Sequence, residues 1–277
     1  MTQLMFRTTG GLFMALQAVP SAYDADTQAF LDASGIVDAT QAGALDTLVI
    51  ALKAAGVWSK LHAIYPIVGG TASTHKWNLK DPRDLDAAFR LTFSGSWTHG
   101  ANGMACGGSE FADTKFSPSA NFASASSASL GVYSRTDTST AGGATPYDMG
   151  ASDGSDTQAT IVISKYSTGA SYYTVGSATY AANVANSDGR GMFLTVRRDG
   201  TDTYGYKNGS QVKVAADSVS LGSSTLYIGA SHKGGSTAYY CGREFAFAVI
   251  GGALTGAEAL DLYNAVQTYQ TSLGRAV

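Results

Sequence analysis

Short runs of apolar and aromatic residues recur along most of the chain, separated by segments rich in Gly, Ser, Asn and Asp. Their length and spacing are typical of the strands of a β-sandwich. Helical crossovers are missing between them, so a parallel α/β sheet is excluded. The runs are residues 61–70, 87–95, 129–136, 159–167, 171–177, 191–200, 202–212, 224–231 and 243–252.

Two turns within this pattern predict hairpins. Asn208-Gly209 is the dipeptide favoured in two-residue type I′ turns, because both positions need a positive φ. Asp199-Gly200 stands between two strand runs in the same way. We therefore expect consecutive antiparallel strands over residues 191–212.

Helical patterns occur at the two ends of the chain. Residues 24–56 predict a helical hairpin, with Asp24 and Asp38 as N-caps and Gly35 and Gly56 as stops. Such a pair is too small to fold alone, so it must dock on the remainder or on a partner. Near the C-terminus, Thr255 and Glu258 form a capping box. An apolar stripe follows, and we expect it to cover the edge or mouth of the sandwich: Ala259, Leu262, Tyr263, Val266, Tyr269 and Leu273.

The first 22 residues leave two interpretations open. Arg7, the apolar run GLFMALQAV and a PSA site before Tyr23 have the order of a secretory signal peptide. The apolar run is short and contains Gln17, which favours instead an arm that packs on a neighbouring subunit. The predicted organisation is therefore an arm at 1–22, a helical hairpin at 23–57 and a sandwich domain at 58–277.

Composition narrows the possible partners. Charged residues make up 14% of the chain, against about 25% in an average soluble protein, and the net charge is −3. The chain therefore lacks the excess of positive charge that is typical of nucleic-acid-binding domains. No apolar run reaches the length of about 18 residues that a membrane span needs, so we expect no span.

The closing strands and helix resemble a known family. Three segments are similar to the concanavalin A-like, laminin G-like jelly-roll domain: residues 193–212, 224–231 and 243–275. They contain KNGSQ, LYIG and FAFAVIGG, and the last is followed by LT, EA, LY and V. The resemblance covers about residues 60–275 and implies a mainly β jelly-roll sandwich. Residues 64–103, with the preceding hairpin, resemble bacteriophage virion proteins that carry such a domain, with structural, decoration or receptor-binding roles.

A search for catalytic groups finds none. Jelly-roll glycoside hydrolases need two carboxylates facing one cleft, and the Glu-x-Asp-x-x-Glu type of run is missing. Glu258 serves the capping box, Glu244 is expected to pair with Arg243, and Glu110 lies in a Gly-rich loop. The four histidines have no zinc-protease spacing. We therefore predict no catalytic residues and no enzymatic activity, although two acids from distant loops could still converge.

The sequence gives little support for a metal site or for a disulfide. Asp148, Asp153 and Asp156 crowd one region and could bind calcium, but their spacing misses the EF-hand pattern, so solvated turns are the simpler interpretation. No metal site or cofactor is otherwise expected. Cys106 and Cys241 can bridge, but spacing alone does not show it, and two buried thiols are the simpler interpretation.

Aromatic residues supply the candidate binding site. Sugars bind proteins through stacked rings and through Asn or Asp hydrogen bonds. The loops SWTHGANG and STAYYCGRE carry such residues, and the alternative is that these rings pack in the core. In the Tyr pair, strand alternation would send one ring inward and one outward. The glycan-binding candidates are Trp97, His99, Asn102, Tyr239 and Tyr240.

These observations favour a non-enzymatic phage virion protein, in a decoration or tail-associated role. It would be made in the host cytoplasm, be held by other virion proteins through its arm, and present a lectin-like domain to host glycans. Such an arm also implies a homo-oligomer or a symmetric array. The alternative is a secreted glycan-binding lectin or a glycan-active enzyme, which a cleaved N-terminus near Tyr23 would favour.

Overall fold

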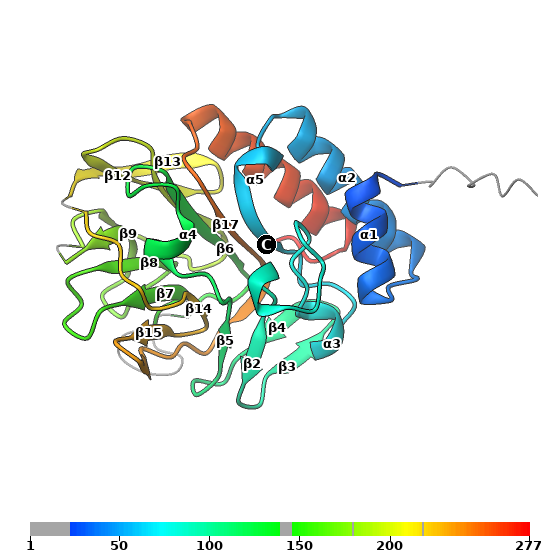
Figure 1. Cartoon of the computed structure of the whole chain (residues 1–277), viewed down its shortest axis with the longest axis horizontal. Coiled ribbons are helices and arrows are strands. Elements are labelled where there is room, and N and C mark those ends of the chain that lie inside the picture. The colour runs from blue at the N-terminus through cyan, green and yellow to red at the C-terminus, as the bar shows by residue number, and fades with distance from the viewer. Residues whose placement is uncertain (1–22, 139–145, 179, 218) are drawn as a thin grey trace, which may run out of the picture.

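A computed structural model describes residues 23–138, 146–178, 180–217 and 219–277 and shows two β-sheets packed face to face, with helices gathered on one side (Figure 1). The predicted fold, a mainly β jelly-roll sandwich with a C-terminal helix, is confirmed. The predicted arm lies outside the described residues. The helices are α1 (Ala25–Ser34), α2 (Ala39–Ala54), α3 (Ala72–His75), α4 (Pro118–Asn121) and α5 (Gly256–Ser272).

The first sheet is antiparallel, and in it the last strand of the chain pairs with the first one. In spatial order its strands are β13 (Ser210–Ala216), β12 (Asp202–Lys207), β11 (Gly191–Arg197), β6 (Ala128–Ser134), β17 (Glu244–Gly251), β4 (Gly103–Ala105) and β3 (Thr98–Gly100), with β1 (Leu61–Tyr65) also on β17.

The second sheet is built from shorter strands and faces the first. Its strands are β10 (Asn183–Ala185), β9 (Ala170–Ser177), β8 (Ala159–Ile163), β7 (Met149–Ser152), β14 (Tyr227–Ile228), β5 (Phe111–Asp113) and β2 (Thr92–Ser94), with β15 (Ser231–Lys233) and β16 (Ser236–Ala238) beside them. Among the described strands, β15 and β7 run parallel.

Helices α1, α2 and α5 form a layer on the outer face of the first sheet. Leu48 of α2 and Leu262 of α5 are fully packed in a cluster with Met192, Leu194 and Phe247 of the strands beneath. The predicted helical hairpin thus docks on the remainder of the chain. The C-terminal helix was expected at the edge or mouth of the sandwich, and this expectation is wrong. Both faces of β11 and β17 are apolar, so the outer face needs a cover of its own.

A second apolar layer lies between the sheets. Phe193, which alternates with Met192 and Leu194 on β11, points inward to join Tyr173 of β9. The Tyr173 ring lies against Gly205 of β12, where a Cβ atom would overlap it. The interior is therefore packed by an aromatic ring from one sheet on a glycine of the other.

The two predicted hairpin turns differ. Asn208 and Gly209 both have positive φ, at 49° and 75°, as a type I′ turn requires. The Asp199-Gly200 connection is longer, because the Asp199 carboxylate accepts hydrogen bonds from the backbone N–H groups of Thr201 and Asp202. The prediction of the same turn type at both places is wrong, although both hairpins exist.

Candidate functional site

Tyrosine side chains gather on the outer face of the second sheet, which no helix of the described chain covers. They pack around Ile161 of β8, whose neighbour Val162 points into the sandwich. We call this group the tyrosine face. It consists of Tyr147, Tyr166, Tyr172, Tyr180 and Tyr239, of which Tyr147 is buried and the other four are half-buried.

The rings of the tyrosine face contact one another in defined pairs. Tyr147 and Tyr239 stack with their centroids 4.6 Å apart and their planes at 25°. Tyr166 and Tyr172 meet edge to face at 5.2 Å. The Tyr147 hydroxyl donates to the Tyr180 hydroxyl at 3.4 Å. These arrangements place both apolar ring surface and phenolic hydroxyls at the outside of the sheet.

A glycine makes room for the stacked pair. Gly150 of β7 points to the outer face, and a Cβ atom there would lie 2.9 Å from Cγ2 of Ile161 and 3.2 Å from Cδ2 of Tyr147. A Cβ atom essentially never lies within 3.0 Å of another heavy atom, so a side chain at this position would force Ile161 to shift and would press on the Tyr147 ring.

An ion pair borders the tyrosine face. The Tyr239 hydroxyl donates to Oδ2 of Asp156 at 2.9 Å and accepts from Nζ of Lys233 at 3.0 Å, while Lys233 and Asp156 pair directly. Ser152 donates to the other carboxylate oxygen at 2.6 Å. The hydrogen bond to Asp156 holds the pKa of Lys233 well above its usual range, so the ammonium stays charged.

Burial raises the pKa of the phenols of Tyr147, Tyr166 and Tyr180. The neutral form of each is therefore favoured near neutral pH. A neutral phenol can donate one hydrogen bond and accept others.

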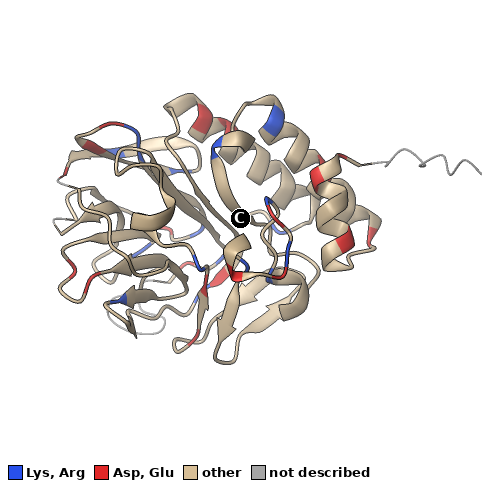
Figure 2. Ribbon diagram, viewed as in Figure 1, with Lys and Arg blue, Asp and Glu red and all other residues tan. Residues whose placement is uncertain are grey.

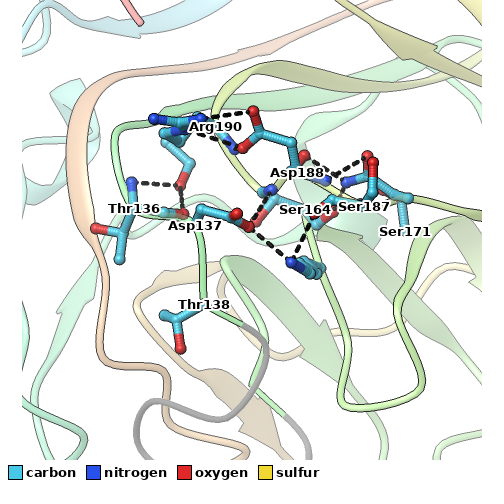
Figure 3. Close-up of polar contacts among 12 residues, drawn as sticks. Thr136, Asp137, Thr138, Ser164, Ser171, Ser187, Asp188 and Arg190 are labelled. Atoms are coloured by element: carbon cyan, nitrogen blue, oxygen red, sulfur yellow. Dashed lines mark hydrogen bonds and ion pairs between the residues drawn. The ribbon is translucent and has the colours of Figure 1, made fainter.

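Polar side chains form a rim at one end of the sandwich, where several strands end (Figure 3). Asp137 follows β6 and accepts from Lys165 Nζ at 2.7 Å and from the Gly189 backbone N–H at 2.9 Å. The hydrogen bond to Lys165 lowers the pKa of Asp137. Lys165 of the rim directly precedes Tyr166 of the tyrosine face in the sequence.

The rest of the rim comes from the connection between β10 and β11. The Asn186 amide donates to the carbonyl of Ser164 at 2.7 Å and accepts from Lys207 Nζ at 2.8 Å. Arg190 holds Asp188 by two hydrogen bonds of 3.0 Å and lowers its pKa (Figure 3). The side chains of Asp188 and Arg190 keep 39% and 49% of their surface exposed, so they can also reach a ligand.

The residues predicted around SWTHGANG lie elsewhere and are mostly packed. Trp97 meets Phe93 edge to face at 6.0 Å and donates through Nε1 to the carbonyl of Phe111. The Nδ1 atoms of His99 and the buried His75 are 2.9 Å apart. Asn102 is exposed in the turn between β3 and β4. Glycan binding by this loop stays a prediction.

Tyr239 and Tyr240 do not lie in a strand, so the expected alternation of their rings does not apply. Both follow the end of β16, both are half-buried, and Tyr239 has a φ of 57°, which breaks the alternation. Tyr239 belongs to the tyrosine face. Sequence reasoning missed its partner Tyr147, because the two rings come from segments far apart in the chain, one just before β7 and one just after β16.

The carboxylates considered for calcium are engaged with different partners. Asp148 is fully buried and pairs with Arg243 at 2.6 Å, Asp153 accepts from the Thr157 backbone N–H, and Asp156 pairs with Lys233. Within the described ranges, no three His, Cys, Asp or Glu side chains come together to hold a metal ion. Calcium binding here stays a prediction.

Glu244 was expected to pair with its neighbour Arg243, and this expectation is wrong. Glu244 accepts from Arg135 at 3.0 Å, while Arg243 turns to Asp148. Glu110 is held by backbone N–H groups of Gly107 and Ser109. The described glutamates thus have structural partners.

Comparison with solved structures finds proteins of similar fold at low sequence identity. A mutant of Trypanosoma rangeli sialidase displaying trans-sialidase activity aligns with a TM-score of 0.52 and 11% identity, over 80% of this chain and 39% of that one. Domain 4 of the GH43 arabinanase AbnA from Geobacillus stearothermophilus, in complex with arabinotriose, aligns at 0.45 with 15% identity, over 73% of this chain and 98% of that domain. The Ruminococcus gnavus IT-sialidase CBM40 aligns at 0.35 with 12% identity, over 50% and 82%.

The sialidase likeness shows the fold and corrects one prediction. The prediction of no enzymatic activity is contradicted, because the aligned sandwich belongs to a glycan-processing enzyme. That prediction depended on a missing local carboxylate motif, and catalytic groups can also converge from distant loops.

No protein-family model matches the chain, and no curated protein matches its sequence. Nothing in the structural likenesses ties it to a phage particle. No helix in the part of the chain that the structure describes is long and apolar enough to span a bilayer.

Proposed function

We propose that this chain is a carbohydrate-binding β-sandwich that holds glycans on the tyrosine face of the second sheet. The observation that carries the proposal is the Tyr147–Tyr239 stack on a sheet face that the helices leave uncovered. Sugar rings present C–H faces that pack on aromatic rings. Their hydroxyls need donors and acceptors nearby, and the Lys233–Asp156 pair and the polar rim supply both.

The charge distribution is compatible with this ligand class. Figure 2 shows that acidic and basic residues are both scattered over the ribbon, with uncharged segments between them. On the tyrosine face the ammonium of Lys233 is neutralised by Asp156. Binding would therefore depend on stacking and on hydrogen bonds more than on net charge. The shared fold with a sialidase chain supports a glycan-related role.

The test is a glycan array with the purified chain, followed by calorimetric titration of the strongest ligand. Tyr239→Ala should reduce affinity about five- to thirtyfold, because a desolvated aromatic contact contributes about 1–2 kcal/mol. Tyr263→Ala, on α5 in the helical layer, is the matched control and should bind as the wild type does. Trp97→Ala examines the loop predicted from sequence.

Each outcome has a definite meaning. Undiminished binding by folded Tyr239→Ala would contradict a site on the tyrosine face, and loss in Trp97→Ala would move it to the other loop. The array ligands are also incubated with the chain and analysed for cleavage products, which separates binding from turnover.

The place of the protein in a phage particle stays a prediction of its own. Proteomics of purified virus particles, with copy number measured against the major capsid protein, would test it. Absence from particles would contradict a virion role, whatever the glycan experiments show.

A further inference from the structure

The two cysteines of the chain lie against each other between the sheets. Their Sγ atoms are 3.6 Å apart, both thiols are free, and both residues are buried, Cys106 at 6% and Cys241 at 0% exposure. Cys106 follows β4 of the first sheet. Cys241 lies in the segment that leads from β16 of the second sheet to β17 of the first.

Backbone pairing produces this proximity. Ala105 pairs with Glu244 across β4 and β17, and the Cys106 N–H donates to the carbonyl of Arg243 at 3.1 Å. The Cys106 thiol donates to the Cys241 carbonyl at 3.0 Å, and the Arg243 N–H donates to Cys106 Sγ at 3.4 Å. The two sulfur atoms are therefore held in place by the register of the first sheet.

We propose that Cys106 and Cys241 form an oxidation site that a small-molecule disulfide converts into an intramolecular disulfide. The sulfur atoms must approach from 3.6 Å to about 2.0 Å. This closure needs an approach of about 1.6 Å between the two sulfur atoms.

The reaction balances with one equivalent of oxidant. The thiolate of Cys106 attacks a sulfur of the small disulfide and releases one small thiol, leaving a mixed disulfide on Cys106. The thiolate of Cys241 then attacks Sγ of Cys106 and releases the second small thiol. The two protein thiols lose two electrons and two protons, and the oxidant takes up both.

The order of attack follows from the surroundings. Burial raises the pKa of the Cys241 thiol well above its usual range, so it stays protonated longer. Cys106 keeps some exposure and Cys241 has none, so the small disulfide reaches Cys106 first. Since both thiols are buried, we expect the reaction to need local opening and to be slower than that of an exposed thiol.

The product would link residues that are 135 positions apart and enclose most of the sandwich. Closing such a long loop restricts the unfolded chain, so the cross-linked protein should unfold at a higher temperature. The segment that the bond anchors also carries Tyr239 and Arg243.

The test incubates the full chain with oxidised glutathione and counts thiols after denaturation. Because the chain has two cysteines, the expected result is a fall from two thiols to none, a mass lower by two hydrogen atoms, and one cross-linked peptide pair. The melting temperature should rise and return on addition of dithiothreitol. Cys241→Ser is the control, and it should retain one thiol or carry one glutathione.

Three results would overturn the proposal. They are two remaining thiols after prolonged incubation of the native protein, stable glutathione adducts on both cysteines, and covalent dimers instead of a cross-linked monomer. None of them depends on glycan binding, so this test and that of the proposed function fail independently.

Discussion

Arg275 donates a hydrogen bond of 2.7 Å from Nη1 to the carbonyl of Ile67, and Ile67 has a φ of 46°. A positive φ is strained for a β-branched residue and persists only where the surroundings over-determine it. The Arg275 guanidinium is almost fully buried and also donates to the carbonyls of Pro66 and Ala246 at 2.8 and 3.0 Å. The last turn of the chain therefore holds the strained segment after β1 in place.

Replacing Arg275 should destabilise the protein through this segment. Arg275→Met removes the buried guanidinium donors, including the one to Ile67, while Pro66 and Ala246 keep hydrogen bonds from Tyr269 and Gln270, so we expect a loss of about 2–4 kcal/mol in the free energy of unfolding. Urea denaturation followed by circular dichroism measures it. Arg190→Met is the control, because Arg190 is exposed and should change stability by less than about 1 kcal/mol. Equal losses in the free energy of unfolding would show that the buried hydrogen bonds of Arg275 add no more stability than the exposed ones of Arg190.

The buried Asp148–Arg243 pair makes a second prediction. Asp148→Ala leaves the Arg243 charge without a carboxylate in a site where both side chains have no exposure, which should cost about 3–5 kcal/mol. Asp81→Ala breaks an exposed pair with Arg83 and should cost less than about 1 kcal/mol. The midpoints of chemical unfolding give both values. A loss below about 1 kcal/mol in Asp148→Ala would mean that Arg243 finds another partner or reaches water.

The contact between Tyr173 and Gly205 predicts a steric effect. Gly205→Ala places a Cβ atom within the Tyr173 ring, so the sheets must separate locally, at a cost of about 1–3 kcal/mol. Gly200→Ala is the control, since a Cβ atom there meets nothing within 4 Å. Thermal unfolding should place the first variant several degrees below the second. Similar melting temperatures would contradict the tight packing between the sheets.

His75 predicts how stability depends on pH. Burial, with contributions from His99 and Arg275, lowers the pKa of His75 from 6.5 to about 3. The unfolded chain therefore binds a proton between these values that the folded chain does not, and stability falls as pH falls below about 6.5. This single group should remove about 2 kcal/mol between pH 6.5 and pH 4.5.

The titration of the His75 ring can be followed directly by NMR. Its ring proton shifts should stay constant down to about pH 4 in the folded protein. His75→Gln should flatten the stability profile above that pH relative to the wild type. A His75 titration near 6.5 in the folded chain would contradict the burial effect.

Local features were predictable because their partners lie within a few residues. The caps at Asp24 and Asp38 accept from nearby backbone N–H groups, as expected. Thr255 and Glu258 form both hydrogen bonds of the capping box, and Asn208-Gly209 makes the expected turn. Each depends on the chemistry of one short segment, and no tertiary contact is needed to specify it.

The candidate site could be predicted only in part. Tyr239 was among the candidates, yet its stack with Tyr147 requires the segment before β7 to lie beside the segment after β16, where the Tyr147 N–H donates to the Tyr239 carbonyl at 3.0 Å. Similarly, Arg243 does not pair with its sequence neighbour Glu244. It pairs with Asp148, which directly precedes β7 of the second sheet. Strand alternation along one segment does not say which distant segment covers it.

The sequence by itself determined a mainly β sandwich, its helical hairpin, its two β-hairpins and its capped C-terminal helix. These follow from hydrophobic period, caps and turn residues, which act over short range. The tertiary structure decided that the helices cover one sheet and leave the tyrosine face of the other uncovered. It also brought Cys106 to Cys241 and Arg275 to Ile67. Such pairs depend on sheet register and on packing across the core, which join residues far apart in the chain.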